Sequence, residues 1–246
     1  MFTQSSLRVA MLMTSPPWRS LTIVGVLVFT VASGATERGQ DHYKLARQYM
    51  SEAKHSSNGV RLLWLGWMIG DELEAAIELD PNLIDARLDL VRYYIVAPRI
   101  VGGSARKARA QAAQITKRDT ALGAWAYGYI DYRDKKYGPA RQKLRDAVKL
   151  AKTPSTKVLA LTWLGWLSQE TQQYDAAFDA WSEVLAIDPT RVEALYEIGR
   201  TSVFAQRELD RGEEALRRYL ASKRTEEMPS EDEAKKLLDQ IAALRH

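Results

Sequence analysis

The apolar residues from residue 40 onward recur every three or four positions, the spacing of an α-helix that buries one face. Alternation of apolar and polar residues, which marks a half-buried strand, is essentially absent. The prolines of this part fall between the periodic segments rather than inside them: Pro81, Pro98, Pro139, Pro154, Pro189 and Pro229. The pattern therefore predicts an all-α chain.

The helical pattern also repeats itself. Leu164 and Gly165 lie in one predicted helix, and Ala177 and Trp181 lie in the next, which ends before Pro189. A proline at that point cannot continue a helix, so it ends one pair of helices and begins the next. The sequence therefore predicts pairs of antiparallel helices joined in series.

A glycine recurs in the first helix of successive pairs, at Gly128, Gly165 and Gly199. Glycine inside a helix costs about 1 kcal/mol relative to alanine, so its recurrence indicates a packing role. We expect the backbones of each pair to approach most closely at this glycine and at the alanine of the second helix. The large apolar residue four positions after that alanine, Trp181 in one pair and Leu144 in another, is expected to fill the groove against the next pair.

These residues resemble the tetratricopeptide repeat family, whose pattern is matched best by Leu164, Gly165, Ala177, Trp181 and Pro189. The segments AAIELDPN and AIDPT, at 75–82 and 186–190, resemble the ends of two further repeats. The resemblance implies an antiparallel helix-pair solenoid with a right-handed superhelix, and an apolar last helix that caps the open end of the stack.

On this pattern the chain has four parts. A signal peptide at 1–35 precedes amino-terminal helices at 36–82, four helix pairs at 83–222, and a linker with a capping helix at 223–246. The amino-terminal helices are expected at about 40–55 and 60–79, and the capping helix at about 230–245. The first pair carries an inserted loop at Val96–Ser104, with Ser104 capping the following helix. The first helix of the last pair is expected to be lengthened by about one turn before Ala215 and Tyr219.

The signal peptide is predicted from the uncharged apolar run Leu21–Ala32, which follows Arg19 and precedes the small residues at 33–35. We expect cleavage after Ala35 and export, most simply to a bacterial periplasm. The alternative is an uncleaved membrane anchor. Twelve residues make about 18 Å of helix, which is short of a hydrocarbon core of about 30 Å unless flanking residues contribute.

Charge and composition narrow the function. The formal charge is +4, and removing residues 1–35, with Arg8 and Arg19, leaves 33 basic against 31 acidic side chains. A mature charge near +2 does not favour nucleic acid or an anionic membrane as partner, so basic runs such as Arg106–Arg109 and Lys117–Arg118 are interpreted as solvated helix faces.

The sequence shows no signature of catalysis. There is no cysteine, so disulfides, thiolate nucleophiles and cysteine metal sites are excluded. His42 and His55 lack the spaced partners of a metal site. The turn at 102–104 lacks the Gly-Lys-Ser/Thr end of a phosphate loop. We therefore expect no cofactor, no metal and no enzymatic activity.

The family resemblance implies a binding groove lined by the first helices of successive pairs. Its expected lining residues, rich in aromatic rings with arginines towards both ends, are Arg92, Trp125, Tyr129, Tyr132, Trp166, Tyr196 and Arg200, with Ile95 and Gln169 at neighbouring register positions. Two interpretations stay open: these rings pack between helices, or they bind a partner.

In the second interpretation, rigid rings supply apolar contact and arginines recognise carboxylates. The function hypothesis is a non-catalytic scaffold of the cell envelope that binds a protein or peptide segment. The alternative is a periplasmic component that binds a small ligand in the aromatic groove.

Overall fold

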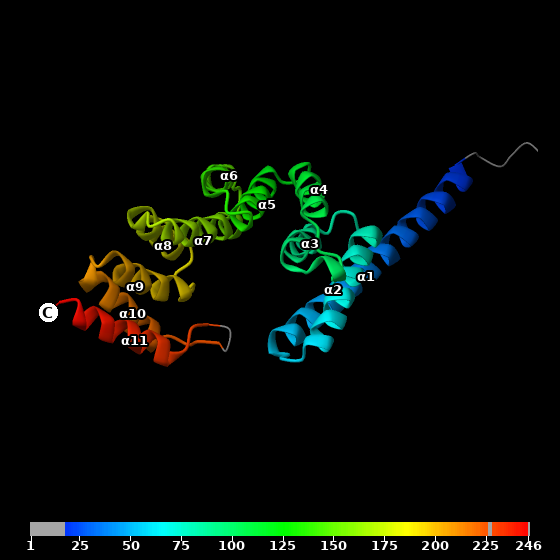
Figure 1. Cartoon of the computed structure of the whole chain (residues 1–246). Helices are drawn as coiled ribbons and strands as arrows, with labels where there is room; N and C mark the ends of the chain where they lie inside the picture. Colours follow the sequence, from blue (N-terminus) through cyan, green and yellow to red (C-terminus); the bar gives the residue numbers. More distant parts are fainter. Residues whose placement is uncertain (1–17, 226–227, 246) are drawn as a thin grey trace, which may run out of the picture. The chain divides into compact units, whose positions relative to one another are not determined.

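The computed structural model describes residues 18–225 and 228–245, with side chains from Gly34 onward. Within these residues the chain is all-α: eleven α-helices and one short 3-10 helix follow one another, and no strand is present (Figure 1). The all-α prediction is confirmed. The chain forms two compact units, one over residues 1–86 and the other over 87–246.

The first unit contains α1 (Trp18–His55) and α2 (Gly59–Leu79), which pack together after a short connection. Asn58 begins α2, because its side-chain oxygen accepts a hydrogen bond from the backbone amide of Arg61 at 3.1 Å. Gly39 allows a close approach, since a Cβ there would lie 3.0 Å from the carbonyl oxygen of Ala76. Near the start of α2, Trp64 and Trp67 remain 44% and 53% exposed.

The predicted signal segment lies largely outside the described part of the structure. Residues 1–17 are outside it altogether, and for 18–33 only the helical backbone is described. The predicted cleavage point, Ala35, falls within α1, which continues without a break to His55. Across the described residues, no helix combines the length and the apolar character that crossing a membrane requires.

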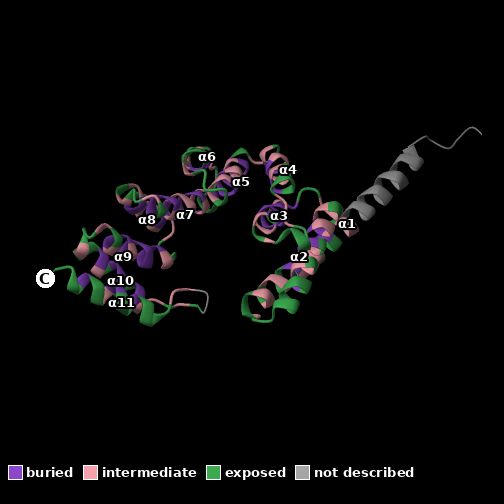
Figure 2. Cartoon of the chain, viewed as in Figure 1, coloured by how far each residue is buried: buried purple, intermediate pink, exposed green. Residues whose placement is uncertain are grey.

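The second unit is a series of helix pairs that ends in a single helix. From α4 onward successive helices contact one another, and the first helices of neighbouring pairs also touch, α5 with α7 and α7 with α9. Figure 2 shows that the buried residues of these helices lie mainly on the sides that face their neighbours. The helices are α3 (Ile84–Val96), α4 (Ala105–Thr116), α5 (Thr120–Arg133), α6 (Tyr137–Leu150), α7 (Pro154–Glu170), α8 (Tyr174–Ile187), α9 (Glu193–Ala205), α10 (Leu209–Ala221) and α11 (Glu231–Ala243).

The recurrent glycines occupy equivalent contacts, as the repeat pattern requires. A Cβ on Gly128 would lie 2.9 Å from Cγ of Leu144, and one on Gly165 would lie 2.5 Å from Cε2 of Trp181. At Gly199 the Cβ would lie 2.3 Å from Cγ of Leu216. Each glycine therefore leaves room for one large side chain of its partner helix.

This arrangement corrects part of the expectation. The large apolar residue of the second helix packs on the glycine of its own pair, rather than only filling the groove against the next pair. A methyl group on the first helix would occupy the volume of that side chain, which explains why the position is glycine and not alanine.

The expected lengthening of α9 is wrong. This helix has 13 residues, against 17 in α7, and ends at Ala205. The connection that follows, 206–208, is as long as those at 134–136 and 171–173, and its Gln206 and Glu208 adopt positive φ angles of 51° and 54°. The small residue that meets α9 is Gly212, where a Cβ would lie 2.5 Å from the side chain of Ser202, rather than Ala215.

The inserted loop of the first pair holds a 3-10 helix, Arg99–Val101 (η1), and a tight turn. Gly102 has a φ of 103°, a left-handed conformation that favours glycine. A Cβ on Gly103 would lie 1.8 Å from the carbonyl oxygen of Ala97. The Ser104 side chain accepts a hydrogen bond from the Lys107 amide and so begins α4, which confirms the predicted cap.

The last helix caps the series as predicted. α11 contacts both α9 and α10 and buries Ala234, Leu237 and Ile241 against them, whereas Leu244 is 39% exposed. Ser230 and Glu233 form a capping box at its start. The hydroxyl of Tyr219 donates to the carbonyl oxygen of Pro229 at 2.5 Å, which fixes the linker to α10.

Candidate functional site

A continuous set of aromatic contacts joins α5, α7 and α8. Trp163 of α7 is its centre, because its ring contacts those of Trp125, Tyr129, Tyr132 and Trp166 at centroid distances between 4.8 and 6.2 Å. Edge-to-face geometry predominates, as the quadrupoles of the rings favour. The set therefore holds two successive helix pairs in a fixed arrangement.

One end of this set is buried. Trp125 is 0% exposed and Tyr129 3% exposed, and their rings stack at 5.6 Å and 8°. The guanidinium of Arg92 lies over the Trp125 ring at 4.9 Å, while its Nη1 donates to Asp89 at 2.8 Å. Burial raises the pKa of Tyr129. In the unbound chain these three residues pack between helices.

The other end opens into a pocket of about 350 Å³, here called the α7–α9 pocket. It is lined by residues of α5, α7 and α9: Tyr132, Trp166, Gln169, Glu170, Arg200 and Phe204. Phe204, near the end of α9, is 51% exposed and lies under the Arg200 guanidinium at 5.6 Å. Three of the seven residues predicted for the groove, Tyr132, Trp166 and Arg200, therefore come together here.

A buried carboxylate, that of Glu197, holds the floor of the pocket. It accepts from Nε1 of Trp166 at 3.2 Å and from Nε2 of Gln169 at 3.0 Å, and it pairs with Nη2 of Arg200 at 2.9 Å. Gln169 also donates to Thr201 at 2.7 Å and accepts from Arg200 at 2.7 Å. Each group is oriented by another, so the network fixes α7 against α9.

Arg200 keeps donor capacity beyond this network. Its Nη2 is used by Glu197 and Gln169, whereas its Nε is buried and has no hydrogen-bond partner. An unpaired buried donor costs free energy, because it has lost water without gaining an acceptor.

A second carboxylate lines the rim. Glu170 accepts from the hydroxyls of Tyr132 at 2.5 Å and Tyr137 at 2.6 Å, and these bonds lower the pKa of its carboxyl group. Burial, together with the bond to Glu170, raises the pKa of Tyr132 to about 12. At neutral pH the rim therefore carries a fixed carboxylate and two neutral phenols, while Arg200 supplies the opposite charge.

No family model matches the chain, and no curated protein sequence matches it. Solved structures do match the chain. The chain superposes on Pseudomonas aeruginosa PilF with a TM-score of 0.57 and 16% identity, over 86% of this chain and 90% of PilF. It superposes on PilW, described as a widely conserved type IV pilus biogenesis factor, with a TM-score of 0.57 and 20% identity, over 84% and 89% of the two chains.

The chain has a tetratricopeptide-like fold. The likeness extends over most of both matched chains and agrees with the glycine contacts at 128, 165 and 199. The prediction made from Leu164, Gly165, Ala177, Trp181 and Pro189 is confirmed at the level of the fold.

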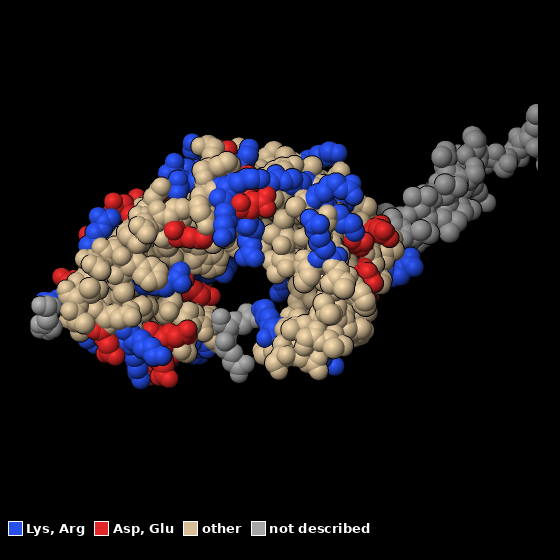
Figure 3. Space-filling model, viewed as in Figure 1, with Lys and Arg blue, Asp and Glu red and all other residues tan. Residues whose placement is uncertain are grey.

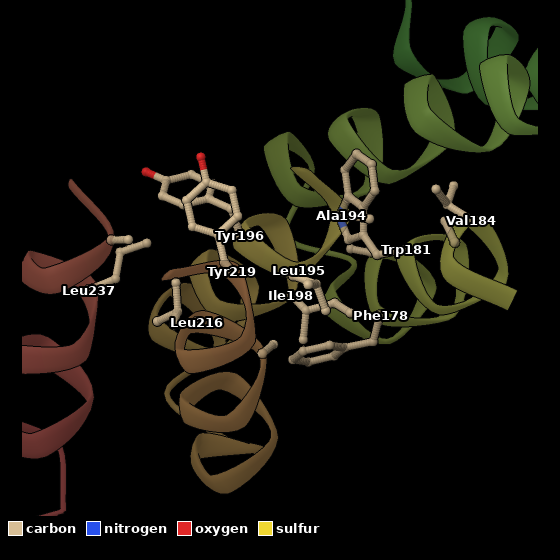
Figure 4. Close-up of a cluster of buried hydrophobic side chains, with 14 of the residues drawn as sticks. Phe178, Trp181, Val184, Ala194, Leu195, Tyr196, Ile198, Leu216, Tyr219 and Leu237 are labelled. Carbon is tan, nitrogen blue, oxygen red and sulfur yellow. The ribbon is translucent and has the colours of Figure 1, made fainter. Parts of the chain in front are cut away.

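Within this tetratricopeptide-like array, Tyr196 lies apart from the α7–α9 pocket lining. It is 9% exposed and packs on Tyr219 of α10 at a centroid distance of 5.5 Å (Figure 4). Figure 4 places both rings between α9 and α10, with Leu237 of α11 nearby. Burial, and then the charge of Glu233, raises the pKa of Tyr196.

Sequence reasoning missed four residues of the site: Trp163, Glu170, Glu197 and Phe204. Helical spacing could have found three of them. Trp163, Trp166 and Glu170 follow one another at intervals of three and four residues, and Phe204 lies four residues after Arg200. The family register gives one row of positions per helix, so it omitted their neighbours on the same face.

The tetratricopeptide-like array offers little for other chemistry. Within the described residues, no group of three or more histidine and carboxylate side chains is arranged to hold a metal ion. His42 instead contacts Glu72, with Nδ1 to Oε2 at 2.5 Å. Of the predicted groove residues, Tyr132, Trp166 and Arg200 line the α7–α9 pocket.

Proposed function

We propose that the chain is a non-catalytic scaffold that binds a segment of a protein partner in the α7–α9 pocket. The observation that carries the proposal is the contrast within the pocket. Its floor is fixed by the Glu197 network, yet Trp166 and Phe204 present ring surface, and Nε of Arg200 has no partner. Preorganised rings and an unpaired guanidinium donor suit a segment with an apolar side chain beside an oxygen acceptor.

We propose further that the chain works in the cell envelope. This part rests on the sequence, in which the apolar run Leu21–Ala32 follows Arg19 and precedes small residues. PilW, which has a similar fold, is described as a type IV pilus biogenesis factor. Determination of the amino terminus of the expressed protein tests export: a mature chain beginning at Thr36 supports a cleaved signal, and an intact chain in the membrane fraction supports the anchor.

Selection of peptides from a random display library on the immobilised full chain tests the pocket. Selected peptides are labelled and titrated by fluorescence anisotropy against two variants with matched exposure. Phe204→Ser removes a ring that is 51% exposed inside the pocket, and Trp67→Ser removes one that is 53% exposed in the first unit.

We expect Phe204→Ser to weaken binding about tenfold or more, and Trp67→Ser to leave it unchanged. Equal affinity for both variants would contradict the proposal. A small apolar anion that raises the Tm of the native chain, but not that of Phe204→Ser, would instead support the small-ligand alternative.

A further inference from the structure

Charge is distributed unevenly along the second unit. Between Pro98 and Lys152 the sequence has fourteen Lys and Arg residues against four acids, at 119, 131, 134 and 146, which is a net charge of about +10. From residue 153 to 225 it has nine basic and eleven acidic residues. Figure 3 shows Lys and Arg gathered over α4 to α6 on the face in view. The small net charge of the whole chain conceals this strongly basic stretch.

The cations of α6 also differ from those of the later helices in their partners. On the later helices, exposed arginines pair with carboxylates, as Arg207 does with Asp175 and Arg245 with Glu213. On α6, by contrast, Lys143, Arg145 and Lys149 are exposed and form no ion pair with the described residues, although Asp146 lies among them. Asp146 offsets only one of these three positive charges, and an acidic partner would relieve the remaining repulsion.

Arg141, on the same helix, is affected by the positive charge of Arg145. Arg141 donates to Thr171 at 2.8 Å, and burial together with the charge of Arg145 lowers the pKa of its guanidinium. Interpreting the basic runs only as solvated helix faces leaves this local excess of charge unexplained.

A pocket lies within this basic stretch, distinct from the α7–α9 pocket and sharing no residue with it. It has a volume of about 400 Å³ and is here called the α5–α6 pocket. Ala124, Tyr127 and Leu150 give it an apolar lining, and Leu150 is 47% exposed. Lys143 and Lys149 line it as well and bring two unpaired cations to its edge. An apolar floor beside free ammonium groups is the complement of an apolar side chain flanked by carboxylates.

We propose that the α5–α6 pocket docks an acidic peptide segment that carries an apolar anchor side chain. The anchor occupies the space beside Tyr127 and Leu150, and the flanking carboxylates lie against Lys143 and Lys149. This surface is additional to the α7–α9 pocket, so a partner chain can engage one of them without the other.

The pocket favours such a segment over a nucleic acid or a membrane. A nucleic acid carries a phosphate on every nucleotide and has no apolar side chain to fill the cavity. Asp146, which lines the pocket, would also repel those phosphates. A bilayer surface is flat at this scale, whereas the pocket is concave. A peptide can place its anchor inside and choose positions for its carboxylates that avoid Asp146.

Binding of two synthetic peptides to the full chain tests the proposal by fluorescence anisotropy. The probe is a fluorescein-labelled peptide with glutamates on both sides of a central leucine, and its control has glutamine in place of every glutamate. The site variant is Lys143→Gln with Lys149→Gln. The matched control variant, Lys223→Gln with Lys236→Gln, removes the same charge from exposed positions outside the pocket.

We expect the glutamate peptide to bind the native chain and the control variant equally. We expect the site variant to bind it about tenfold more weakly, because two ion pairs are lost, and binding to weaken as salt is added. Phe204→Ser should leave this affinity unchanged, which separates failure here from failure of the α7–α9 pocket.

Two results of the peptide titrations would overturn the proposal: an equal loss of affinity in both lysine variants, or equal binding of the glutamine peptide. Lysine-dependent binding of duplex DNA or of anionic vesicles in place of the peptide would also overturn it. So would lysine-dependent self-association on size-exclusion chromatography. In the last case a second copy of the chain is the occupant. Circular dichroism of each variant confirms that the fold is retained, which these exposed substitutions are expected to permit.

Discussion

Gly165→Ala should destabilise the protein, although alanine is the better helix former. Replacing a helix-interior glycine by alanine gains about 1 kcal/mol in helix propensity. Here the new Cβ would lie 2.5 Å from Cε2 and 2.6 Å from Cζ2 of Trp181. Trp181 is 2% exposed and its ring packs against Trp166 at 5.9 Å, so the indole cannot move aside easily.

Forcing a methyl group into such a contact costs about 1–3 kcal/mol. Subtracting the gain in propensity leaves an expected loss of about 1 kcal/mol in the free energy of unfolding. Urea unfolding followed by circular dichroism measures this loss as a lower midpoint at an unchanged slope.

Two further variants make this prediction specific. Gly138, in the first turn of α6, has no atom within 4 Å of an added Cβ, so Gly138→Ala should stabilise the protein by about 0.5 kcal/mol. Trp181→Leu is destabilising alone, yet it frees space beside residue 165. The double variant with Gly165→Ala should therefore show a favourable coupling of about 1 kcal/mol. If Gly165→Ala stabilises the chain as much as Gly138→Ala does, the close-packing argument is refuted.

Three other predictions follow from the site and the cap. Glu197→Ala should cost about 2 kcal/mol in urea unfolding, because it leaves Nε1 of Trp166 without its acceptor and Arg200 with Gln169 alone, whereas Glu214→Ala at an exposed position should cost almost nothing. Ultraviolet titration should show Tyr132 ionising at about pH 12, and Glu170→Gln should lower that pKa. Because the folded-state pKa of Tyr132 is raised above 10, its contribution to stability is complete below about pH 10 and is lost as pH rises towards 12. Ser230→Ala should cost about 1 kcal/mol in urea unfolding through loss of the capping box, and no loss would contradict the assigned cap.

The fold was largely predictable because its main constraint is local and repeated. A small residue is needed wherever a large side chain of the partner helix lies against the backbone. Gly128, Gly165 and Gly199 occupy three such positions. The last pair was harder, because the small residue that meets α9 is Gly212, where a Cβ would lie 2.5 Å from the side chain of Ser202, and not Ala215. Counting from Gly199 to Ala215 instead of to Gly212 made the pair about one turn too long, and the extra length was assigned to α9.

The site was less predictable, for a physical reason. α5 buries residues on nearly every side, including Ala121, Trp125, Ala126 and Ile130, so its apolar pattern does not distinguish a face towards a partner from a face towards a neighbouring helix. The family register placed Trp125 and Tyr132 in one row, yet the first is buried and the second lines the pocket.

Nuclear magnetic resonance of the tryptophan indoles tests the central claim, that the α7–α9 pocket captures a partner segment, most directly. The chain has seven tryptophans, and Trp166→Phe assigns the one whose Nε1 donates to Glu197. On titration with a peptide selected on the full chain, the Trp166 signal should shift and saturate at the Kd found by anisotropy, while Trp67 stays unchanged. Saturable peptide binding with an unmoved Trp166 signal would contradict the account.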